Sequence, residues 1–193
     1  MGSARVGAVQ FQVSDVRGRE RPYFHLHGYA MQQSDDDEVK RIFWDEMSTC
    51  LGKADPLAIR VITMDTNSSI GVREGADDDV CGRFGLPHVN PAGQEVKSWM
   101  STYGFYAIST HFKRGRKGCD YGTWRHFRSG KMYQNDHIFI AREDLKRVRS
   151  CRNQSVLADS DHMCVKLSLR LNMRLARKAT TQQDECVVLI TMF

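Results

Sequence analysis

Four short polar segments carry the residue types that could do chemistry on a phosphate. They are residues 65–67 (Asp-Thr-Asn), 123–124 (Thr-Trp), 134–138 (Gln-Asn-Asp-His-Ile) and 160–162 (Ser-Asp-His), and each lies beside an apolar run. A carboxylate paired with a histidine can hold a metal ion or a phosphate and move a proton in one place. The segments fall where strands should end, and loops at strand ends place reactive side chains on a rigid scaffold.

Asp136 interrupts an apolar run, and a buried charge there needs a partner. His162 is the natural candidate, since a carboxylate fixes the imidazole tautomer and raises its basicity. Asp161 would then face a divalent metal, and Mg²⁺ prefers carboxylate and water ligands. An ordinary loop is the alternative interpretation of residues 160–162.

Asp65 and Asn67 directly follow an apolar run, where they could hold a water and a phosphoryl oxygen together. The alternative is an Asx-turn that closes the strand. Tyr29 ends another predicted strand and could donate its hydroxyl to a phosphate. The alternative is an amphipathic tyrosine at a strand end.

Two other features allow a functional and a structural interpretation. His25 and His27 alternate along a strand and so share a face, but no third metal ligand is in view, which favours packed or exposed histidines. Trp124 is either a core residue or a platform on which a base stacks.

The clearest element that must position these groups is a helix at residues 34–51. Ser34 is the predicted cap, three aspartates occupy the first turn, and Gly52 stops the helix. Helical spacing predicts one buried face formed by Val39, Ile42, Phe43, Met47 and Leu51.

Strands are predicted around this helix at residues 6–13, 23–29, 57–64, 105–108, 121–125, 133–141 and 163–171, and a strand is expected to end at 156–157. A shorter helix is expected at residues 94–102, a helical turn at 142–147, a loop at 71–93 and a basic loop at 113–117. This pattern predicts a sheet-rich α/β layered domain.

The totals fit one globular domain: 193 residues, 41% hydrophobic and 26% charged, with a net charge of +5. The charge is uneven, because residues 111–152 hold twelve Lys/Arg against four Asp/Glu. Residues 34–80 reverse this balance, with twelve acidic residues against five basic. The basic region predicts an anionic partner such as nucleic acid, and a solvated charged surface is the alternative.

The six cysteines form no C-x-x-C pair, which argues against a zinc ribbon or a thioredoxin-like site. No signal peptide opens the sequence and no apolar run is long enough to cross a bilayer. We therefore expect reduced thiols, an intracellular location that includes the nucleus, and no membrane partner.

Together these segments resemble the endonuclease/exonuclease/phosphatase superfamily, which has the DNase I-like fold. The family pattern runs Tyr-Ala-Pro, Gly-Asp-Phe-Asn, Thr-Trp, Ile-Asp-Tyr-Ile and Ser-Asp-His. This chain has, in the same order, Tyr29-Ala30-Met31, Met64-Asp65-Thr66-Asn67, Thr123-Trp124, Asn135-Asp136-His137-Ile138 and Ser160-Asp161-His162. Residues 82–85 (Gly-Arg-Phe-Gly), 108–112 (Ile-Ser-Thr-His-Phe), Asn90 and Gly93 resemble the non-LTR retrotransposon endonucleases.

The resemblance implies an α/β (α+β) fold, a two-sheet β-sandwich flanked by helices, and cleavage of phosphodiesters or phosphomonoesters with Mg²⁺ or Mn²⁺. It also implies a role for each of six residues. Asp65 would orient or deprotonate the attacking water, Asn67 would position that water and the phosphate, Asp136 and His162 would stabilise the pentacovalent phosphorane, Asp161 would contact the metal, and Tyr29 would bind phosphate.

The chain also departs from the family pattern. Active members have a further N-terminal half, which carries an Asn and a metal-binding Glu that are not found here. We therefore expect residues 1–171 to be a partial domain that lacks its N-terminal part, and residues 172–193 to be a tail or junction. Met31, Thr66 and His137 replace Pro, Phe and Tyr, and Met64 replaces a Gly, which predicts crowding of the site by an added Cβ.

Three hypotheses remain open. The first is a metal-dependent DNA endonuclease that binds DNA through residues 111–152. The second is a catalytically inactive remnant that at most binds nucleic acid, and the missing Glu separates these two. The third is a phosphoesterase for a phosphoinositide or sphingomyelin, against which the retrotransposon-like segment argues.

Overall fold

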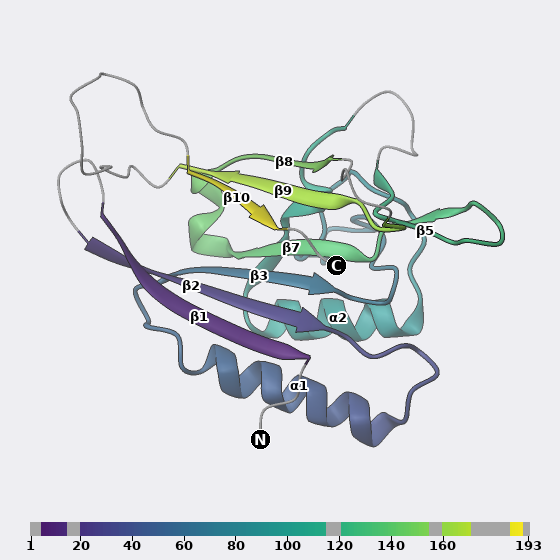
Figure 1. Cartoon of the computed structure of the whole chain (residues 1–193), viewed down its shortest axis with the longest axis horizontal. Helices are drawn as coiled ribbons and strands as arrows, with labels where there is room; N and C mark the ends of the chain where they lie inside the picture. Colours follow the sequence, from purple (N-terminus) through teal and green to yellow (C-terminus); the bar gives the residue numbers. More distant parts are fainter. Residues whose placement is uncertain (1–4, 15–19, 115–120, 155–159, 171–185, 191–193) are drawn as a thin grey trace.

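The computed structural model describes residues 5–14, 20–114, 121–154, 160–170 and 186–190. A five-stranded sheet has the order β1-β2-β3-β7-β4, and a three-stranded sheet has the order β10-β9-β8 (Figure 1). The bounds of the first sheet are β1 Val6–Ser14, β2 Glu20–Tyr29, β3 Ile59–Asp65, β4 Phe105–Ala107 and β7 Asp136–Ala141. Those of the second sheet are β8 Val148–Gln154, β9 Cys164–Leu169 and β10 Cys186–Ile190.

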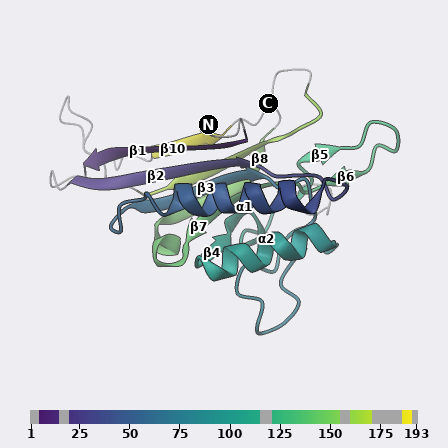
Figure 2. The same cartoon turned by 90° about the horizontal axis from the view of Figure 1, so that it is seen from below.

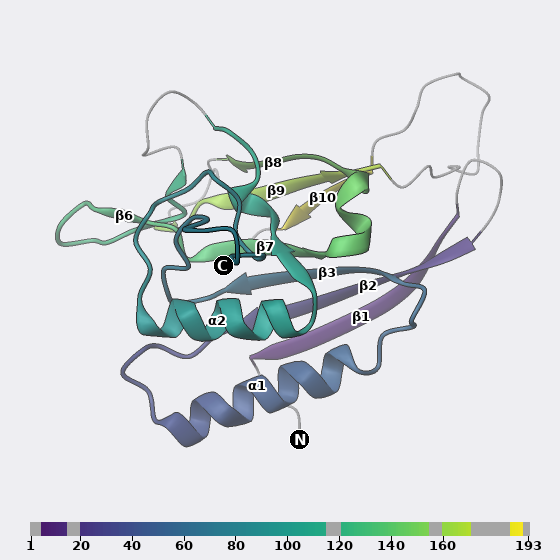
Figure 3. The ribbon, with the colours of Figure 1, turned by 180° about the vertical axis from the view of Figure 1, so that it is seen from behind.

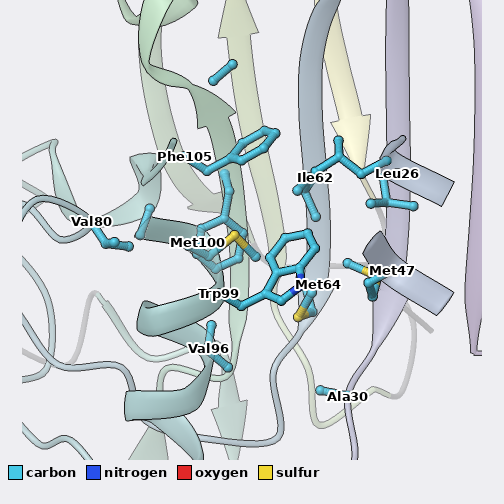
Figure 4. Close-up of a cluster of buried hydrophobic side chains, with 14 of the residues drawn as sticks. Leu26, Ala30, Met47, Ile62, Met64, Val80, Val96, Trp99, Met100 and Phe105 are labelled. Carbon is cyan, nitrogen blue, oxygen red and sulfur yellow. The ribbon is translucent and has the colours of Figure 1, made fainter. Parts of the chain in front are cut away.

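Two helices, α1 (Asp37–Leu51) and α2 (Pro91–Thr102), cover one face of the five-stranded sheet (Figures 2 and 3). The helix α1 connects β2 to β3, and these two strands are parallel, as such a crossover requires. The helices contact each other through the stacked rings of Trp44 and Trp99, whose centroids are 5.5 Å apart. Leu26, Ile62 and Met64 of the sheet pack against them in the larger apolar core (Figure 4).

The second sheet packs on the opposite face of β3 and β7. Ile59 and Val61 from β3 form a second apolar cluster there with Val165, Leu167 and Leu169 from β9. Because both faces of β3 are covered, nearly all of its residues are buried, which explains why its sequence is an almost continuous apolar run. The sheet-rich α/β prediction is confirmed as two packed sheets with a helical layer on one of them.

The helix predicted at residues 34–51 is present, but its first residue and part of its buried face differ. Asp36 is the cap, because its side chain accepts a hydrogen bond from the backbone N–H of Glu38 at 2.8 Å. Phe43, Met47 and Leu51 are buried as predicted, and the helix ends at Gly52. The prediction was wrong for Val39 and Ile42, which are exposed.

Several other predicted boundaries shift. The short helix begins at Pro91 rather than at residue 94, with Asn90 as its cap. The strand at 105–108 ends at Ala107 and continues as a 3₁₀ turn, Ile108–Thr110. The predicted helical turn at 142–147 is a 3₁₀ turn, Arg142–Arg147.

The strand predicted at 121–125 is reduced to β5 (Trp124–Arg125), which pairs with β6 (Met132–Tyr133) in a two-stranded ribbon. The strand predicted at 133–141 begins only at Asp136.

The C-terminal strand β10 pairs antiparallel with β9. The assignment of residues 172–193 to a tail or junction stays a prediction, since most of them lie outside the described residues. Outside them too lie the strand end predicted at 156–157, part of the predicted basic loop at 113–117, and Cys119. In the described part of the chain, no helix is both long and apolar enough to span a membrane.

Candidate functional site

Two buried carboxylates face each other where β3 ends and β7 begins. Asp65 is the last residue of β3, Asp136 is the first of β7, and the antiparallel register pairs them directly. Both side chains are almost completely buried. Like charges placed so close in a desolvated position repel each other, so this arrangement needs a compensating positive charge.

His162 supplies one compensating group, as the sequence predicts for the partner of Asp136. Its Nδ1 lies 3.0 Å and 3.2 Å from the two carboxylate oxygens of Asp136. Because a carboxylate oxygen can only accept here, Nδ1 carries the proton, and Nε2 remains available for another partner. Ligand atoms of Asp65, Asp136 and His162 all lie within 4.8 Å of one another.

Thr123 holds these segments together, a role that its sequence does not reveal. Its fully buried hydroxyl accepts hydrogen bonds from the backbone N–H groups of Asn135 and Asp136, at 3.0 Å and 2.9 Å. Its carbonyl accepts a bond from the N–H of Met163, directly after His162. A fully buried hydroxyl must be bonded, so Thr123 fixes the start of β7 against the 160–162 segment.

Trp124 is neither a core residue nor an isolated platform. Its indole Nε1 donates a hydrogen bond of 2.7 Å to the carboxylate of Asp161, and it forms a β-bridge with His162. Trp124 is half-buried and Asp161 is exposed. The tryptophan therefore orients the carboxylate for which the sequence predicts metal binding.

The segment after Asp65 forms the Asx-turn that was the alternative interpretation. The Asp65 carboxylate accepts the backbone N–H of Asn67 at 2.9 Å, and Asn67 has a left-handed φ of 44°. The Asn67 side chain donates to the carbonyl of Ala30 at 2.8 Å, which leaves its amide oxygen for another partner. The turn thus closes the strand and also directs Asn67 toward the cavity described next.

These groups surround one open cavity of about 860 Å³. Of the six predicted site residues, five line it: Tyr29, Asp65, Asn67, Asp161 and His162. Asp136 lies behind His162 instead. The structure therefore brings all six predicted residues together, from strand ends that lie up to 133 positions apart in the sequence. Tyr29 reaches the cavity because it pairs with Asp65 in the β2–β3 register.

The surroundings of Asp65 and His162 raise the pKa of both side chains. Burial, and then the charge of Asp136, raises the pKa of Asp65 to about 6. The hydrogen bond to Asp136 raises the pKa of His162 above its ordinary value. A carboxyl group that titrates near neutrality can accept a proton, and a neighbouring imidazolium can stabilise negative charge.

The residues present fit a divalent cation. The Asp65 and Asp161 carboxylates line the same cavity, and carboxylate oxygens are ligands that Mg²⁺ prefers. His162 suits a phosphate better than a metal, because its hydrogen bond with Asp136 favours the protonated ring, and a protonated ring cannot bind a metal.

Two replaced family positions do not disturb the site. The predicted crowding by Met64 was wrong, because its side chain is fully buried in the core on the helix side of the sheet. His137 points away from the cavity into a closed network: its Nε2 donates to the carbonyl of Gln134 at 2.9 Å, and its Nδ1 accepts from Ser109 at 2.8 Å. Burial lowers the pKa of His137 to about 4, so it stays neutral.

Gly82 and Gly93, two glycines of the retrotransposon-like segment, allow the backbone to pack closely against neighbouring loops. A Cβ on Gly82 would lie 2.3 Å from the carbonyl oxygen of Thr110, and one on Gly93 would lie 2.0 Å from that of Ser69. Asn90 accepts the backbone N–H groups of Gly93 and Ser69, at 2.9 Å and 3.2 Å. Asn90 therefore attaches the start of α2 to the loop that follows Asn67.

His25 and His27 do not form a metal pair with a third ligand among the described residues. Both rings contact the hydroxyl of Thr63, at 2.9 Å and 3.2 Å. Burial lowers the pKa of each, which keeps them neutral. The alternative of packed or exposed histidines therefore holds, since His25 is half-buried and His27 is exposed and lines the cavity.

Sequence comparison identifies no relative of this chain. No family model matches it, and no curated protein matches its sequence.

Solved structures do match it. The catalytic domain of Xenopus laevis APE2 aligns with a TM-score of 0.59 and 17% identity, over 86% of this chain and 55% of that one. The endonuclease domain of TRAS1, a telomere-specific non-LTR retrotransposon, aligns with a TM-score of 0.52 and 14% identity, over 89% and 70%. The 3′ phosphatase NExo from Neisseria, bound to product DNA hairpin, aligns with a TM-score of 0.53 and 12% identity, over 76% and 62%.

The fold implied by the sequence resemblance is thus confirmed, because the chain shares its fold with these three structures. It spans about half the length of the APE2 domain and less than three quarters of the other two.

Proposed function

We propose that this chain, which has the DNase I-like fold, is a metal-dependent phosphodiesterase of the endonuclease type that acts on DNA. The observation that carries the proposal is the cluster of Asp65, Asp136 and His162, of which Asp65 and His162 line one cavity. An Asp-His pair beside a second carboxylate of raised pKa is an arrangement for moving protons around a phosphate.

In this proposal Asp65 is the general base. Its pKa of about 6 leaves it ionised at neutral pH, yet basic enough to take a proton from a water molecule. That water attacks the phosphorus and passes a proton to Asp65, while the bond from phosphorus to one bridging oxygen breaks and the leaving oxygen takes a proton from solvent. Asn67, fixed by its bond to Ala30, positions the water and the phosphate.

His162 and Tyr29 bind the phosphate. Asp136 holds the Nδ1–H of His162, so the ring presents Nε2 and its positive charge to the phosphate oxygens. The half-exposed Tyr29 adds a hydroxyl donor at the other side of Asp65. These donors are fixed before substrate arrives, which is what makes such stabilisation effective.

Asp161, oriented by Trp124, would hold Mg²⁺ or Mn²⁺, and Asp65 would stay free to act as the base. When bound, the ion withdraws charge from the phosphate and lowers the pKa of a bound water.

The basic region supports a nucleic-acid substrate. The hairpin of β5 and β6 carries Arg125, Arg128 and Lys131, and at its tip Phe127 is 78% exposed with Arg128 over its ring. Cations bind phosphates and an exposed ring can stack on a base. The likeness to the TRAS1 endonuclease domain supports an origin from a retrotransposon, and a DNA substrate would place the protein in the nucleus. The same hairpin favours a second candidate, a catalytically inactive domain that binds nucleic acid.

Nicking of supercoiled plasmid DNA by the purified chain tests the proposal. We expect nicking with Mg²⁺, none with EDTA, and strong loss in Asp161→Ala. Asp45→Ala is the matched control, because Asp45 is an exposed aspartate on α1, outside the residues that line the site cavity. A folded protein that binds DNA but never nicks it would overturn the enzyme proposal in favour of the binding domain.

A further inference from the structure

A second cavity, of about 670 Å³, lies behind the bridge between Trp124 and His162. Trp124 and His162 line the acidic cavity described above, whereas their neighbours Arg125 and Met163 line the second one. Successive residues of extended chain point to opposite faces, so the two cavities lie on opposite sides of this bridge.

The second cavity is basic. Four cationic side chains line it, and none of its described lining residues carries a carboxylate. These cations are Lys113, Arg114, Arg125 and Arg152. Within the described ranges, none of the four forms an ion pair with an acidic side chain. We call it the basic cavity.

Arg114 is the unusual member of this group, because only 7% of it is exposed. Its guanidinium donates to the Asn153 side chain and, at 3.3 Å, to the carbonyl of Ser109. Its buried Nε has no hydrogen-bond partner. A buried cation that meets only neutral acceptors pays a desolvation cost that an anion would offset.

The surrounding contacts hold Arg114 in place. Asn153, which binds it, also donates to the carbonyl of Gly122 at 2.8 Å. The backbone N–H of Arg114 donates to the Tyr121 hydroxyl at 2.9 Å, and the guanidinium lies 5.8 Å from the centre of that ring. A guanidinium fixed in this way loses little conformational entropy on binding a ligand.

We propose that the basic cavity binds a phosphate group, as an anion site separate from the acidic cavity. The planar donors of arginine match phosphate oxygens, and Lys113, Arg125 and Arg152 are exposed, so they can close around the bound group. The volume is within the range of pockets that hold nucleotide-sized ligands. The phosphate can belong to a free nucleotide or to a nucleic-acid strand, and neither requires the chain to be a nuclease.

The test is calorimetric titration of the full chain with inorganic phosphate in EDTA, where no metal-dependent cleavage takes place. We expect saturable binding that weakens about tenfold in Arg152→Gln and again in the double variant with Arg125→Gln, since each removes one charge-assisted hydrogen bond. Arg149→Gln is the matched control: it lies on the same strand, is exposed and does not line the cavity. It should bind phosphate within about twofold of the original chain.

Arg114→Gln tests the buried cation of the cavity, with folding checked by circular dichroism. If it folds, phosphate should no longer raise its melting temperature. If it does not fold, Arg152→Gln and the double variant with Arg125→Gln carry the test. Competition by a short 5′-phosphorylated oligonucleotide would assign the site to a strand, and competition by a deoxynucleoside monophosphate alone would assign it to a nucleotide. Absence of saturable phosphate binding, or equal weakening in Arg149→Gln, would overturn the proposal.

Discussion

The two faces of β3 share one backbone and differ in what they bury. On the helix side, Ile62 and Met64 are completely buried among apolar side chains. On the other side, Ile59 and Val61 are apolar, but the strand then continues with Thr63 and Asp65. The helix side therefore has its only polar residue, Arg60, at the far end of the strand, whereas the other side changes from apolar to polar as it approaches the cavity.

This difference separates stability from function within a single strand. Burying apolar surface stabilises the fold, whereas a buried carboxylate beside another one destabilises it. The pKa of Asp65, raised to about 6, is the measure of that destabilisation. Substitutions on the helix face should change stability alone, and substitutions at the polar end should change activity and stability in opposite directions.

The largest effect is expected from Asp65→Asn, which keeps the shape of the side chain and removes its basicity. Plasmid nicking with Mg²⁺ should fall about 10³-fold, since general base catalysis is lost. Asp45→Asn on the exposed face of α1 is the control and should keep the original rate. Full activity in Asp65→Asn would show that the polar end of β3 does not take part in the reaction.

In the core on the helix side of β3, Met47→Ala on α1 should lower the free energy of unfolding by about 4 kcal/mol, because Met47 is completely buried. Chemical denaturation measures this change, and the nicking rate per folded molecule should not change. Val39→Ala on the same helix is the control, since Val39 is exposed and should matter by less than about 0.5 kcal/mol. A selective loss of nicking in folded Met47→Ala would break the separation of the two faces.

The stability that Asp65→Asn gains over the original chain should depend on pH. The folded pKa of Asp65, about 6, lies above its ordinary value, so its favourable contribution is present at low pH and is lost as pH rises through about 6. At neutral pH, Asp65→Asn should therefore be more stable than the original chain by up to about 3 kcal/mol. Denaturation at several pH values measures this, and the gain should vanish below about pH 4. A loss of stability at neutral pH would contradict the proposed repulsion.

The smallest effect concerns the connection between the helix layer and the site. Asn90→Ala removes the cap of α2 and its bond to the N–H of Ser69, which should cost about 1 kcal/mol of unfolding free energy. Asn90→Asp keeps an acceptor oxygen and should restore most of that stability. If both substitutions are equally destabilising in thermal denaturation, the cap is not what holds this loop.

Regular periodicity made the scaffold predictable. The helix α1 and the strand β3 follow from apolar spacing, because one face or both faces of each element are buried. Spacing could not decide that Val39 and Ile42 stay exposed or that Asp36 rather than Ser34 forms the cap, since neighbouring polar residues compete for that position. The two-residue strand β5 is too short for a period to be read.

The clustering of the candidate site residues was predictable through motif order, and their contacts were less so. The pairing of Asp136 with His162 follows from the need to compensate a buried charge. The bond from Trp124 to Asp161 and the two bonds accepted by Thr123 could not be predicted, because they depend on how three separate segments meet. A polar residue beside an aromatic one at a strand start was their only signal.

The most direct test of the central claim is the pH dependence of DNA cleavage in the presence of Mg²⁺, measured under single-turnover conditions. We predict a rate that rises with pH as Asp65, whose pKa is about 6 before a cation binds and lower beside one, loses its proton, and that falls again at higher pH as His162 loses its own. The residual rate of Asp65→Asn should lack the rising limb. A flat profile, or a rising limb that survives in Asp65→Asn, would contradict the assignment of this cluster as the catalytic site.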